Sequence, residues 1–225
     1  MPRMSIFLLH LETSTKICSV ALSKDGAVVD FIDRIGDGFI HGESLTLMIE
    51  EVLEKCQIPL SALSGISYSA GPGSYTGLRI GLSTAKGLCF ALQIPLIAIP
   101  THQSLCQIGL LHASSQQQKI ICMLDARRLE VYFEGFDTRG NVIEHLRCQI
   151  IDANSFNAFL PCLVVGDANE KIAALTEDPR VSFIDEKLSA KYQATLAYKK
   201  YQEQHFEDLA YCSPIYLKGA NGVLL

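Results

Sequence analysis

The hydrophobic and polar positions divide the first part of the chain into apolar runs separated by short polar turns. An apolar run at 6–11 is followed by the acid Glu12, and a second strand is predicted at 17–23. The turn Lys24-Asp25-Gly26 then leads into a third strand that opens at Val28. Glycine suits such a turn because it adopts positive φ without steric cost. The pattern predicts a strand, an acid and then an antiparallel hairpin.

A similar unit recurs about half the chain length later. The apolar run at 120–124 ends at Asp125, and a strand at 130–136 leads through the turn at 137–140 into a further strand at Val142. The recurrence favours a duplicated fold, although two unrelated hairpins in one chain would produce the same pattern.

Between the hairpins, helical and strand patterns alternate. Residues 43–56 carry apolar side chains at the spacing of an amphipathic helix, with charged residues off that stripe. We expect further elements as follows: strands at 66–70, 94–99, 163–165 and 181–184, and helices at 77–92, from Pro100 to about 111, near 168–176 and near 187–204. The alternation predicts an α/β protein with two lobes, at 1–110 and 111–225, whose C-terminal tail can return to the first lobe.

Composition limits the class of protein. The chain has 225 residues, 48% hydrophobic and 19% charged, with a net charge of −5. It has no basic block that could form the electrostatic footprint of a nucleic-acid binder. Its eight cysteines form no CxxC pair, which is typical of reduced thiols, and no apolar run reaches membrane-spanning length. We therefore expect a cytoplasmic protein without a membrane span.

The most informative segment is the glycine-rich loop at 71–77, between a predicted strand and a predicted helix. Such loops can bind phosphate through backbone N–H groups at a helix N-terminus. No Lys-Ser or Lys-Thr follows Gly77, and the dinucleotide-binding spacing of glycines is absent. A purely structural turn explains the loop equally well.

The longer run from Gly71 to Gly81, with Ala85-Lys-Gly-Leu after it, resembles the signature of the TsaB family, also known as YeaZ. Further similar motifs are Leu11-Glu12-Thr13-Ser14-Thr15, His41-Gly-Glu-Ser44, Asp125-Ala126-Arg127 and Glu130-Val131-Tyr132. The similarity is weaker at Gly166-Asp167-Ala168 and at Pro214–Lys218, where the family tends to have Arg at the last position. The motifs cover residues 1–132 well and the remainder thinly.

The resemblance implies the duplicated actin-like (ASKHA) fold, with a mixed sheet flanked by helices in each lobe. It implies a non-catalytic subunit that pairs with TsaD and the ATPase TsaE to make N6-threonylcarbamoyladenosine on tRNAs reading codons that start with adenosine. ATP and metal are then expected on the partners, tRNA is met mainly through the complex, and the chain alone forms a homodimer. The alternative is a small actin-like kinase or ATPase that acts alone.

Actin-like ATPases use an acid at the end of each lobe's first strand to handle metal and phosphate. Glu12 and Asp125 stand at these places. Together with Gly71, Gly73, Ser74, Arg127 and Gly166 they form a possible vestigial nucleotide site. Adenosine normally needs two adjacent glycines in the second lobe, where this chain has only Gly166. We therefore expect no catalytic residue and no tightly bound cofactor.

Other polar residues allow more than one role. His102 and Cys106 are four residues apart, as two zinc ligands on a helix would be, but they lack further ligands and lie in an apolar series. We expect no metal there. His41 could cap the first helix or contact a partner. Arg127, Arg128, Lys16 and Arg79 could form a small basic site for tRNA phosphate, or remain solvated surface.

Small residues recur every four positions in the predicted helix at 77–92, at Gly77, Gly81 and Ala85. A groove of small residues lets another helix approach closely. The family resemblance puts the first two helices at the surface that pairs with TsaD or with a second copy. The expected contact residues are His41, Leu45, Met48, Gly77, Gly81 and Ala85. The alternative is that these glycines pack against the protein's own sheet.

Overall fold

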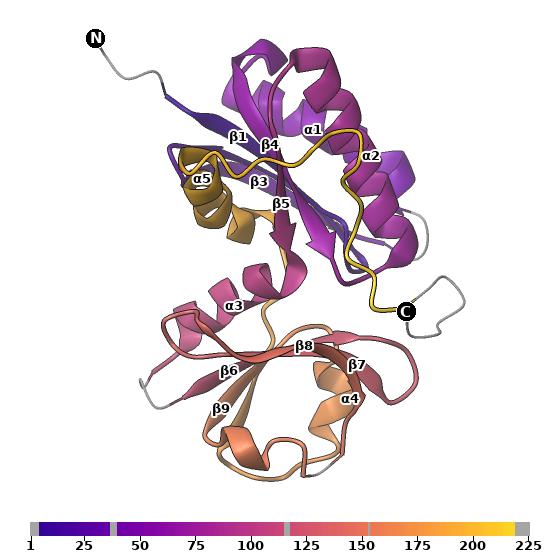
Figure 1. Cartoon of the computed structure of the whole chain (residues 1–225), viewed down its shortest axis with the longest axis vertical. Helices are drawn as coiled ribbons and strands as arrows, with labels where there is room; N and C mark the ends of the chain where they lie inside the picture. The colour runs from indigo at the N-terminus through magenta and orange to yellow at the C-terminus, as the bar shows by residue number, and fades with distance from the viewer. Residues whose placement is uncertain (1–4, 37–39, 115–117, 153, 219–225) are drawn as a thin grey trace. The chain divides into compact units, whose positions relative to one another are not determined.

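The structure is a computed structural model that describes residues 5–36, 40–114, 118–152 and 154–218 (Figure 1). It divides into two compact units. The first comprises Met1–Thr101 and Ser189–Ile215, and the second comprises His102–Leu188 and Tyr216–Leu225. The division therefore falls at Thr101–His102 rather than after residue 110, and a long C-terminal segment belongs to the first unit.

The first unit is built on a five-stranded mixed sheet with the order β3-β2-β1-β4-β5. The strands are β1 (Phe7–Glu12), β2 (Ile17–Lys24), β3 (Ala27–Ile35), β4 (Leu63–Gly71) and β5 (Leu96–Pro100). The first three are antiparallel neighbours, whereas β4 pairs parallel with both β1 and β5. The strand, acid and hairpin predicted for this part of the chain are thus confirmed.

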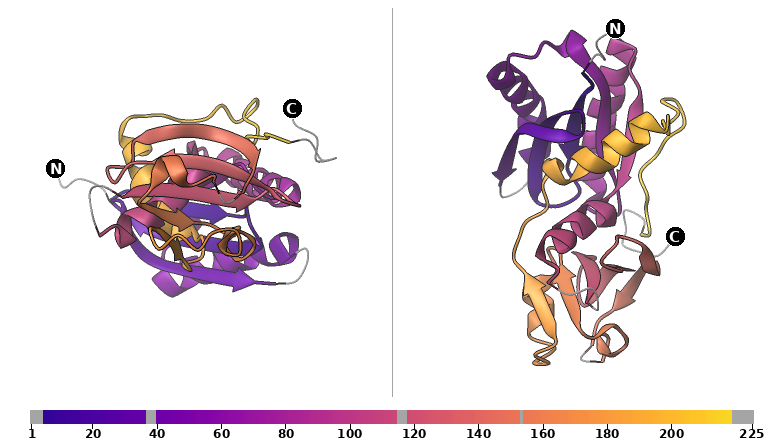
Figure 2. Two further views of the ribbon diagram at one scale, coloured as in Figure 1. Left: turned by 90° about the horizontal axis from the view of Figure 1, so that it is seen from below. Right: turned by 90° about the vertical axis from the view of Figure 1, so that its left-hand side faces the viewer.

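Helices cover both faces of this sheet (Figures 1 and 2). One face carries α1 (Ile40–Cys56) and α2 (Tyr75–Leu92), and the other carries the short helix η3 (Ala190–Gln193) and α5 (Ala194–Gln202); η1 (Leu60–Ala62) precedes β4. Successive side chains of a strand point to opposite faces. Leu9 and Leu11 accordingly pack in the core with α1 and α2, while Leu8 packs with Ala197 of α5. This two-sided burial explains the apolar run at 6–11, which only His10 interrupts.

The second unit repeats this topology, with the order β10-β9-β6-β7-β8. Its strands are β6 (Lys119–Asp125), β7 (Glu130–Phe136), β8 (Val142–Ile150), β9 (Cys162–Val165) and β10 (Val181–Ile184). Its helices are α3 (Thr101–His112, whose first residue belongs to the first unit), η2 (Asn157–Phe159) and α4 (Asn169–Ala173). β6, β7 and β8 are antiparallel neighbours, and β9 pairs parallel with β6 and β10. The recurring hairpin is therefore a true structural repeat.

Two predicted helices differ from the structure. The helix expected near 168–176 is limited to 169–173, and the helix expected near 187–204 begins only at Ala190, as η3. Residues 185–189 carry no regular structure. The hydroxyl of Ser19 accepts a hydrogen bond from Ala190 N at 2.7 Å, and Ser189 Oγ donates to Asp33 Oδ1 at 2.8 Å. These contacts hold the segment on the sheet before the helix can start.

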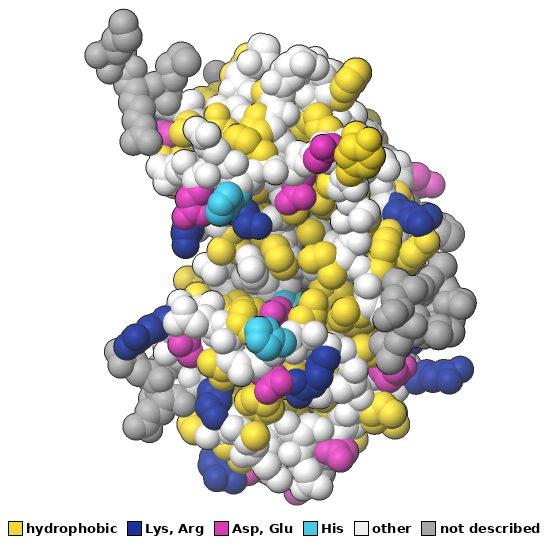
Figure 3. All heavy atoms as spheres, in the orientation of Figure 1, with side chains coloured by type: hydrophobic (Ala, Val, Ile, Leu, Met, Phe, Trp, Pro, Cys, Tyr) yellow, Lys and Arg dark blue, Asp and Glu magenta, His cyan; other side chains and the backbone are white. Residues whose placement is uncertain are grey.

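Within the described part of the chain, none of the helices combines the length and the apolar character that crossing a bilayer requires. Charged side chains of both signs are scattered over the face seen in Figure 3, with hydrophobic side chains between them. That distribution agrees with the absence of a basic block in the sequence.

Candidate functional site

Glu12 closes β1 and is completely buried in the first unit. Its Oε1 accepts hydrogen bonds from the backbone N–H and the hydroxyl of Ser14, at 2.8 and 2.6 Å. Its Oε2 accepts a bond of 3.4 Å from the side-chain amide of Gln193. Burial raises the pKa of this carboxyl, while the bonds from Ser14 and Gln193 oppose the rise. Both oxygens of the first candidate acid are therefore engaged by the protein itself.

The glycine loop lies against the same turn. Ser74 N donates to Ser14 O at 2.6 Å, and a Cβ added at Gly73 would overlap Ser14. The hydroxyl of Ser74 caps α2 by accepting from Gly77 N at 3.2 Å. At Gly71, where φ is +108°, an added Cβ would come within 2.6 Å of the carbonyl oxygen of Ile215. The structure thus brings Gly71, Gly73, Ser74 and Glu12 together, with Ser14 between the loop and the acid.

A buried polar chain continues from this turn into the sheet. His10 is fully buried, with Nδ1 2.6 Å from Ser67 Oγ and Nε2 2.7 Å from Ser23 Oγ. Ser67 in turn donates to Gln193 Oε1 at 2.7 Å, so His10 Nδ1 carries the proton that Ser67 accepts. Burial lowers the pKa of His10 to about 3 and keeps the ring neutral. The sequence signal for this network was a polar residue inside each of three strands, β1, β2 and β4.

The six residues expected to form a partner surface lie inside the first unit instead. Leu45, Met48 and Ala85 are in the core between the sheet and its helices. A Cβ at Gly77 would overlap the carbonyl oxygen of Thr13, and one at Gly81 would overlap the Thr13 hydroxyl. The small residues of α2 therefore serve close packing on the β1–β2 turn, which is the alternative that the sequence left open.

His41, the sixth of these residues, is also buried. Its Nε2 lies 2.9 Å from the carbonyl oxygen of Thr15, so the ring ties the start of α1 to the β1–β2 turn. Burial lowers the pKa of His41, and the bond to Thr15 opposes that change. The structure thus gives His41 a contact within its own unit.

A groove lies next to the expected surface, on the outer side of α1 and α2. It encloses about 800 Å³, and its lining includes Leu47, Leu53, Ile58, Leu60, Gly87 and Leu88. Leu47 and Leu60 are 57% and 42% exposed, and Glu50 and Glu54 also line the groove. An added Cβ at Gly87 would meet nothing within 4 Å. Gly87 is a groove residue that the sequence analysis missed, because only the four-residue spacing of Gly77, Gly81 and Ala85 was considered.

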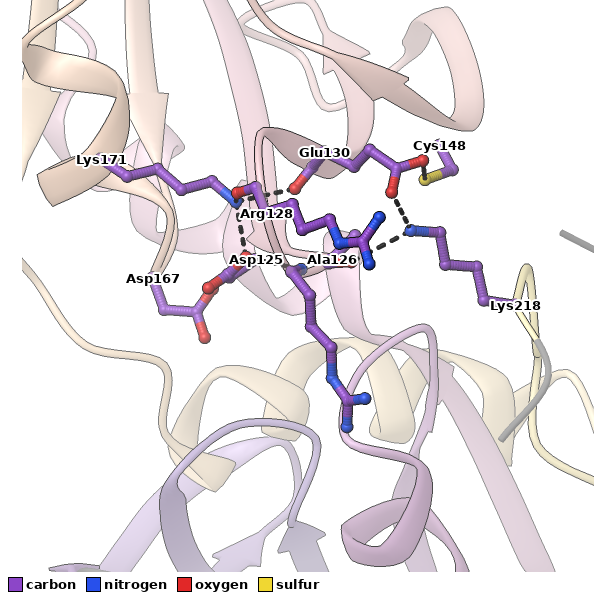
Figure 4. A network of polar contacts seen from close by, with 9 residues as sticks. Asp125, Ala126, Arg128, Glu130, Cys148, Asp167, Lys171 and Lys218 are labelled. Carbon is purple, nitrogen blue, oxygen red and sulfur yellow. Dashed lines mark hydrogen bonds and ion pairs between the residues drawn. The ribbon is translucent and has the colours of Figure 1, made fainter. Parts of the chain in front are cut away.

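In the second unit, Asp125 closes β6 and is held by a lysine (Figure 4). Lys171 Nζ lies 2.6 Å from Asp125 Oδ1, which also accepts from Arg127 N at 2.8 Å. Lys171 further donates to the carbonyl oxygens of Arg128 and Glu130, each at 2.8 Å. Asp125 N donates to Asp167 Oδ1 at 2.8 Å. The ammonium group of Lys171 is therefore paired with Oδ1 of Asp125, the second candidate acid.

Gly166 is used for packing. Its φ is +139°, and an added Cβ would overlap the carbonyl oxygen of Met123. Only glycine combines that backbone angle with so close an approach of two strands. This contact accounts for Gly166 within the second unit.

A second ion pair joins the C-terminal segment to the same hairpin. Lys218 is buried, and its Nζ lies 2.6 Å from Glu130 Oε2 and 3.0 Å from the carbonyl oxygen of Ala126. The bond from Lys218 lowers the pKa of Glu130 against the effect of burial. Cys148 Sγ is 3.8 Å from Glu130 Oε1. Lys218 thus provides a cation for Glu130.

His102 and Cys106 lie on the buried side of α3. His102 Nε2 is 2.9 Å from the carbonyl oxygen of Tyr132, and burial lowers the pKa of the ring to about 4. Burial also raises the pKa of Cys106 to about 12, which disfavours the thiolate that zinc binds. Among the residues that the structure describes, no three or more His, Cys, Asp or Glu side chains are grouped as a metal site would require.

The two acids, the glycine loop and the doubled sheet can be compared with known proteins. The family model for TsaD, described as tRNA N6-adenosine threonylcarbamoyltransferase, matches residues 40–223. The chain belongs to the TsaD family. Its sequence is similar to two TsaB proteins, described as tRNA threonylcarbamoyladenosine biosynthesis proteins, which confirms the TsaB resemblance within this family.

These TsaB proteins come from Escherichia coli, 30% identical over 138 residues, and Haemophilus influenzae, 35% identical over 130 residues. The matches cover 61% and 57% of this chain but only 58% and 53% of the relatives' own lengths. A solved structure of YeaZ from Pseudomonas aeruginosa matches with a TM-score of 0.76 at 24% identity, covering 94% of this chain and all of that one. The fold of this TsaD-family chain is the actin-like one that the motifs predicted.

Proposed function

We propose that this chain is a non-catalytic TsaB-type subunit that pairs with a TsaD-type protein in the synthesis of N6-threonylcarbamoyladenosine on tRNA. The observation that carries the proposal is the state of its two candidate acids. Glu12 is buried and bonded to Ser14 and Gln193, and Asp125 is paired with Lys171. Both oxygens of Glu12 and Oδ1 of Asp125 are thus engaged within the chain, which disfavours the divalent cation that such acids hold in actin-like ATPases.

The remaining parts of the machinery then belong to partners. ATP and metal are carried by the TsaD-type subunit and by TsaE, and this chain holds no cofactor tightly on its own. tRNA is met mainly through the assembled complex, in the cytoplasm. The family descriptions of tRNA threonylcarbamoyladenosine biosynthesis and of the threonylcarbamoyltransferase support a role in this modification pathway.

We further propose the groove of α1 and α2 as the surface that takes the TsaD-type subunit, through an apolar helix of that partner. Leu47 and Leu60 offer exposed apolar area, and the acids Glu50 and Glu54 favour basic residues beside that helix. Glycine inside a helix costs stability relative to alanine, and no described residue lies close enough to Gly87 to require it. Close packing of a partner helix against α2 would explain why glycine stands at this position. In the absence of TsaD, a second copy of the chain is expected to occupy the groove.

The test is Gly87→Arg, mixed with the TsaD-type protein and analysed by size-exclusion chromatography. The variant should fold, because the position is open to solvent, and it should no longer co-elute with TsaD. Loss of an interface hot spot of about 2–4 kcal/mol corresponds to roughly 30- to 1,000-fold weaker binding. The matched control is Gln202→Arg, which adds the same charge at an exposed position of α5 on the other face of the sheet.

A folded Gly87→Arg variant that still co-elutes with TsaD would remove the groove from the pairing surface. The non-catalytic role is contradicted by a different result. Tight binding of Mg-ATP to the chain alone would raise its stability by about 2.7 kcal/mol at a hundredfold excess over Kd, and a thermal-shift titration would detect that change. Such a result would favour an actin-like kinase or ATPase.

A further inference from the structure

The turn between β6 and β7 carries two consecutive arginines in an unusual backbone conformation. Arg127 has a φ of +71° and Arg128 a φ of +51°, in the left-handed region that glycine and asparagine adopt more readily. Both side chains are exposed, and within the described residues no hydrogen bond or ion pair engages either guanidinium. Arginine therefore contributes nothing to this turn that glycine or asparagine would not, which points to a role outside the fold.

The acids beside these arginines are already occupied. Asp125 pairs with Lys171 and Glu130 pairs with Lys218, each at 2.6 Å. Asp167 accepts from the backbone of Asp125. Four cations, Lys171, Lys218, Arg127 and Arg128, thus stand beside three carboxylates, which leaves the turn with a local excess of positive charge on a chain whose net charge is −5.

The same two lysines hold the turn in place. Lys171 Nζ bonds the carbonyl oxygens of Arg128 and Glu130, and Lys218 Nζ bonds that of Ala126. They approach the turn from opposite sides (Figure 4). The bond from Arg127 N to Asp125 Oδ1 closes the start of the turn. The arginines are thus presented on a backbone fixed in advance, which reduces the entropy lost when a ligand binds.

Exposed apolar side chains lie beside the arginines. Leu129 is 59% exposed and Ile150 is 66% exposed. The register pairs Ile150 with Glu130, and Ile151 N donates to Leu129 O at 3.2 Å, so the end of β8 lies alongside the turn. A nucleotide can bind to such a surface. Its phosphate can accept bidentate hydrogen bonds from the guanidinium groups, and its sugar and base can pack against the exposed apolar side chains.

We propose that the β6–β7 turn of the second unit is a phosphate-binding site, in which Arg127 and Arg128 bind the phosphate groups of RNA. The choice of RNA rests on the proposed role in tRNA modification. A free nucleotide offers the same phosphate chemistry, so it forms a separate arm of the experiment. An acidic surface of the TsaD-type subunit is the rival partner for the arginines.

The experiment compares the full-length chain with the double variant Arg127→Asn, Arg128→Asn. Asparagine tolerates the left-handed region, so the variant keeps the turn and its fold while it loses both charges. The control is Arg139→Ala, which removes one exposed arginine from the turn between β7 and β8. Binding is measured with unmodified tRNA over a series of salt concentrations, and separately with Mg-ATP and with inorganic phosphate.

The parent and Arg139→Ala should bind tRNA alike, and the double variant should bind it at least roughly tenfold more weakly. The dependence of log K on log salt should become shallower by roughly two, one unit for each lost phosphate contact. If the double variant loses binding of Mg-ATP and inorganic phosphate but still binds tRNA like the parent, the site binds phosphate, and its ligand is a free nucleotide rather than RNA.

The proposal is overturned if the double variant binds every phosphate probe as well as the parent, or if the parent binds none of them. It is also overturned if the double variant keeps its phosphate binding but no longer co-elutes with TsaD, because the arginines would then serve the rival protein contact. Failure here is distinct from failure of the proposed function, since pairing with TsaD is measured in the parent chain and depends on a groove of the first unit.

Discussion

Two glycines of α2 have opposite surroundings although the sequence presents them alike. Gly81 faces the hydroxyl of Thr13, whereas Gly87 faces open space. We expect Gly81→Ala to destabilise the chain by about 1–3 kcal/mol through overpacking. We expect Gly87→Ala to stabilise it by about 1 kcal/mol, because alanine is the better helix former.

Urea denaturation of the two variants checks this prediction, since the same substitution is made twice on one helix. The slope of free energy against urea concentration should stay unchanged, so that the shift in midpoint reports stability alone. Equal destabilisation by both alanines would show that the outer side of α2 is packed as tightly as its inner side.

Glu134 of β7 makes the stability of the second unit depend on pH. Burial raises the pKa of this carboxyl to about 7, from 4.5 in the unfolded chain. The folded state therefore keeps a proton that the unfolded state releases, and the free energy of unfolding falls as pH rises from about 4.5 to 7. Glu134→Gln should stabilise the chain at pH 8 and have little effect at pH 4.

Thermal unfolding of parent and variant across this pH range checks the expectation. Glu177→Gln, at an exposed position, is the matched control and should track the parent throughout. A difference between parent and Glu134→Gln that stays constant from pH 4 to pH 8 would mean that the carboxyl titrates alike in both states.

At the scale of elements, Gln193 connects η3 to the sheet of the first unit. Its side chain is fully buried, accepts from Ser67, and donates to the carbonyl oxygen of Leu11 and to Glu12. Gln193→Ala leaves these groups without partners, which should cost about 1–3 kcal/mol. Hydrogen exchange should then become faster in η3 and α5 than in α1.

The matched control is Gln202→Ala, which removes the same side chain from an exposed position of α5. It should change neither stability nor exchange. Uniform acceleration across the first unit in Gln193→Ala would show that the segment unfolds together with the whole sheet rather than by itself.

The elements that the sequence predicted well are those whose signal is local. The apolar runs, the glycine turns and the stripe of α1 each depend on neighbours in sequence, and the structure has all of them. Residues 187–189 were wrongly predicted as helix because the conformation there depends on Ser19 and Asp33, far away in the chain. Periodicity carries no information about such contacts.

The candidate site divides in the same way. Glu12, Asp125 and the glycine loop were recognisable because each follows a strand. Their partners Gln193 and Lys171 were missed, because each belongs to a segment without a motif of its own. The sequence therefore showed where the two acids lie, but not which groups of the chain bind their carboxylates.

At the scale of the whole molecule, both units keep the first strand of an actin-like ATPase and the acid at its end. The two carboxylates, however, have different hydrogen-bond partners. The first unit buries Glu12 and surrounds it with neutral hydrogen-bond donors, whereas the second pairs Asp125 with an ammonium group. In both units of the duplicated fold, the acid thus binds groups of its own unit.

These contacts of Glu12 and Asp125 lead to a prediction for the assembled machinery. The isolated chain should make no threonylcarbamoyladenosine from threonine, bicarbonate, ATP and tRNA, and addition of the TsaD-type protein, TsaE and an activated threonylcarbamoyl donor should restore synthesis. In that assembly, Glu12→Gln and Asp125→Asn in this chain should each reduce the rate by less than about threefold, whereas loss of a catalytic acid costs roughly 10²–10⁴-fold. Gly87→Arg serves as the contrasting variant, since it should abolish synthesis by preventing pairing. A hundredfold loss in Asp125→Asn, with pairing and folding intact, would instead make this chain part of the catalytic site.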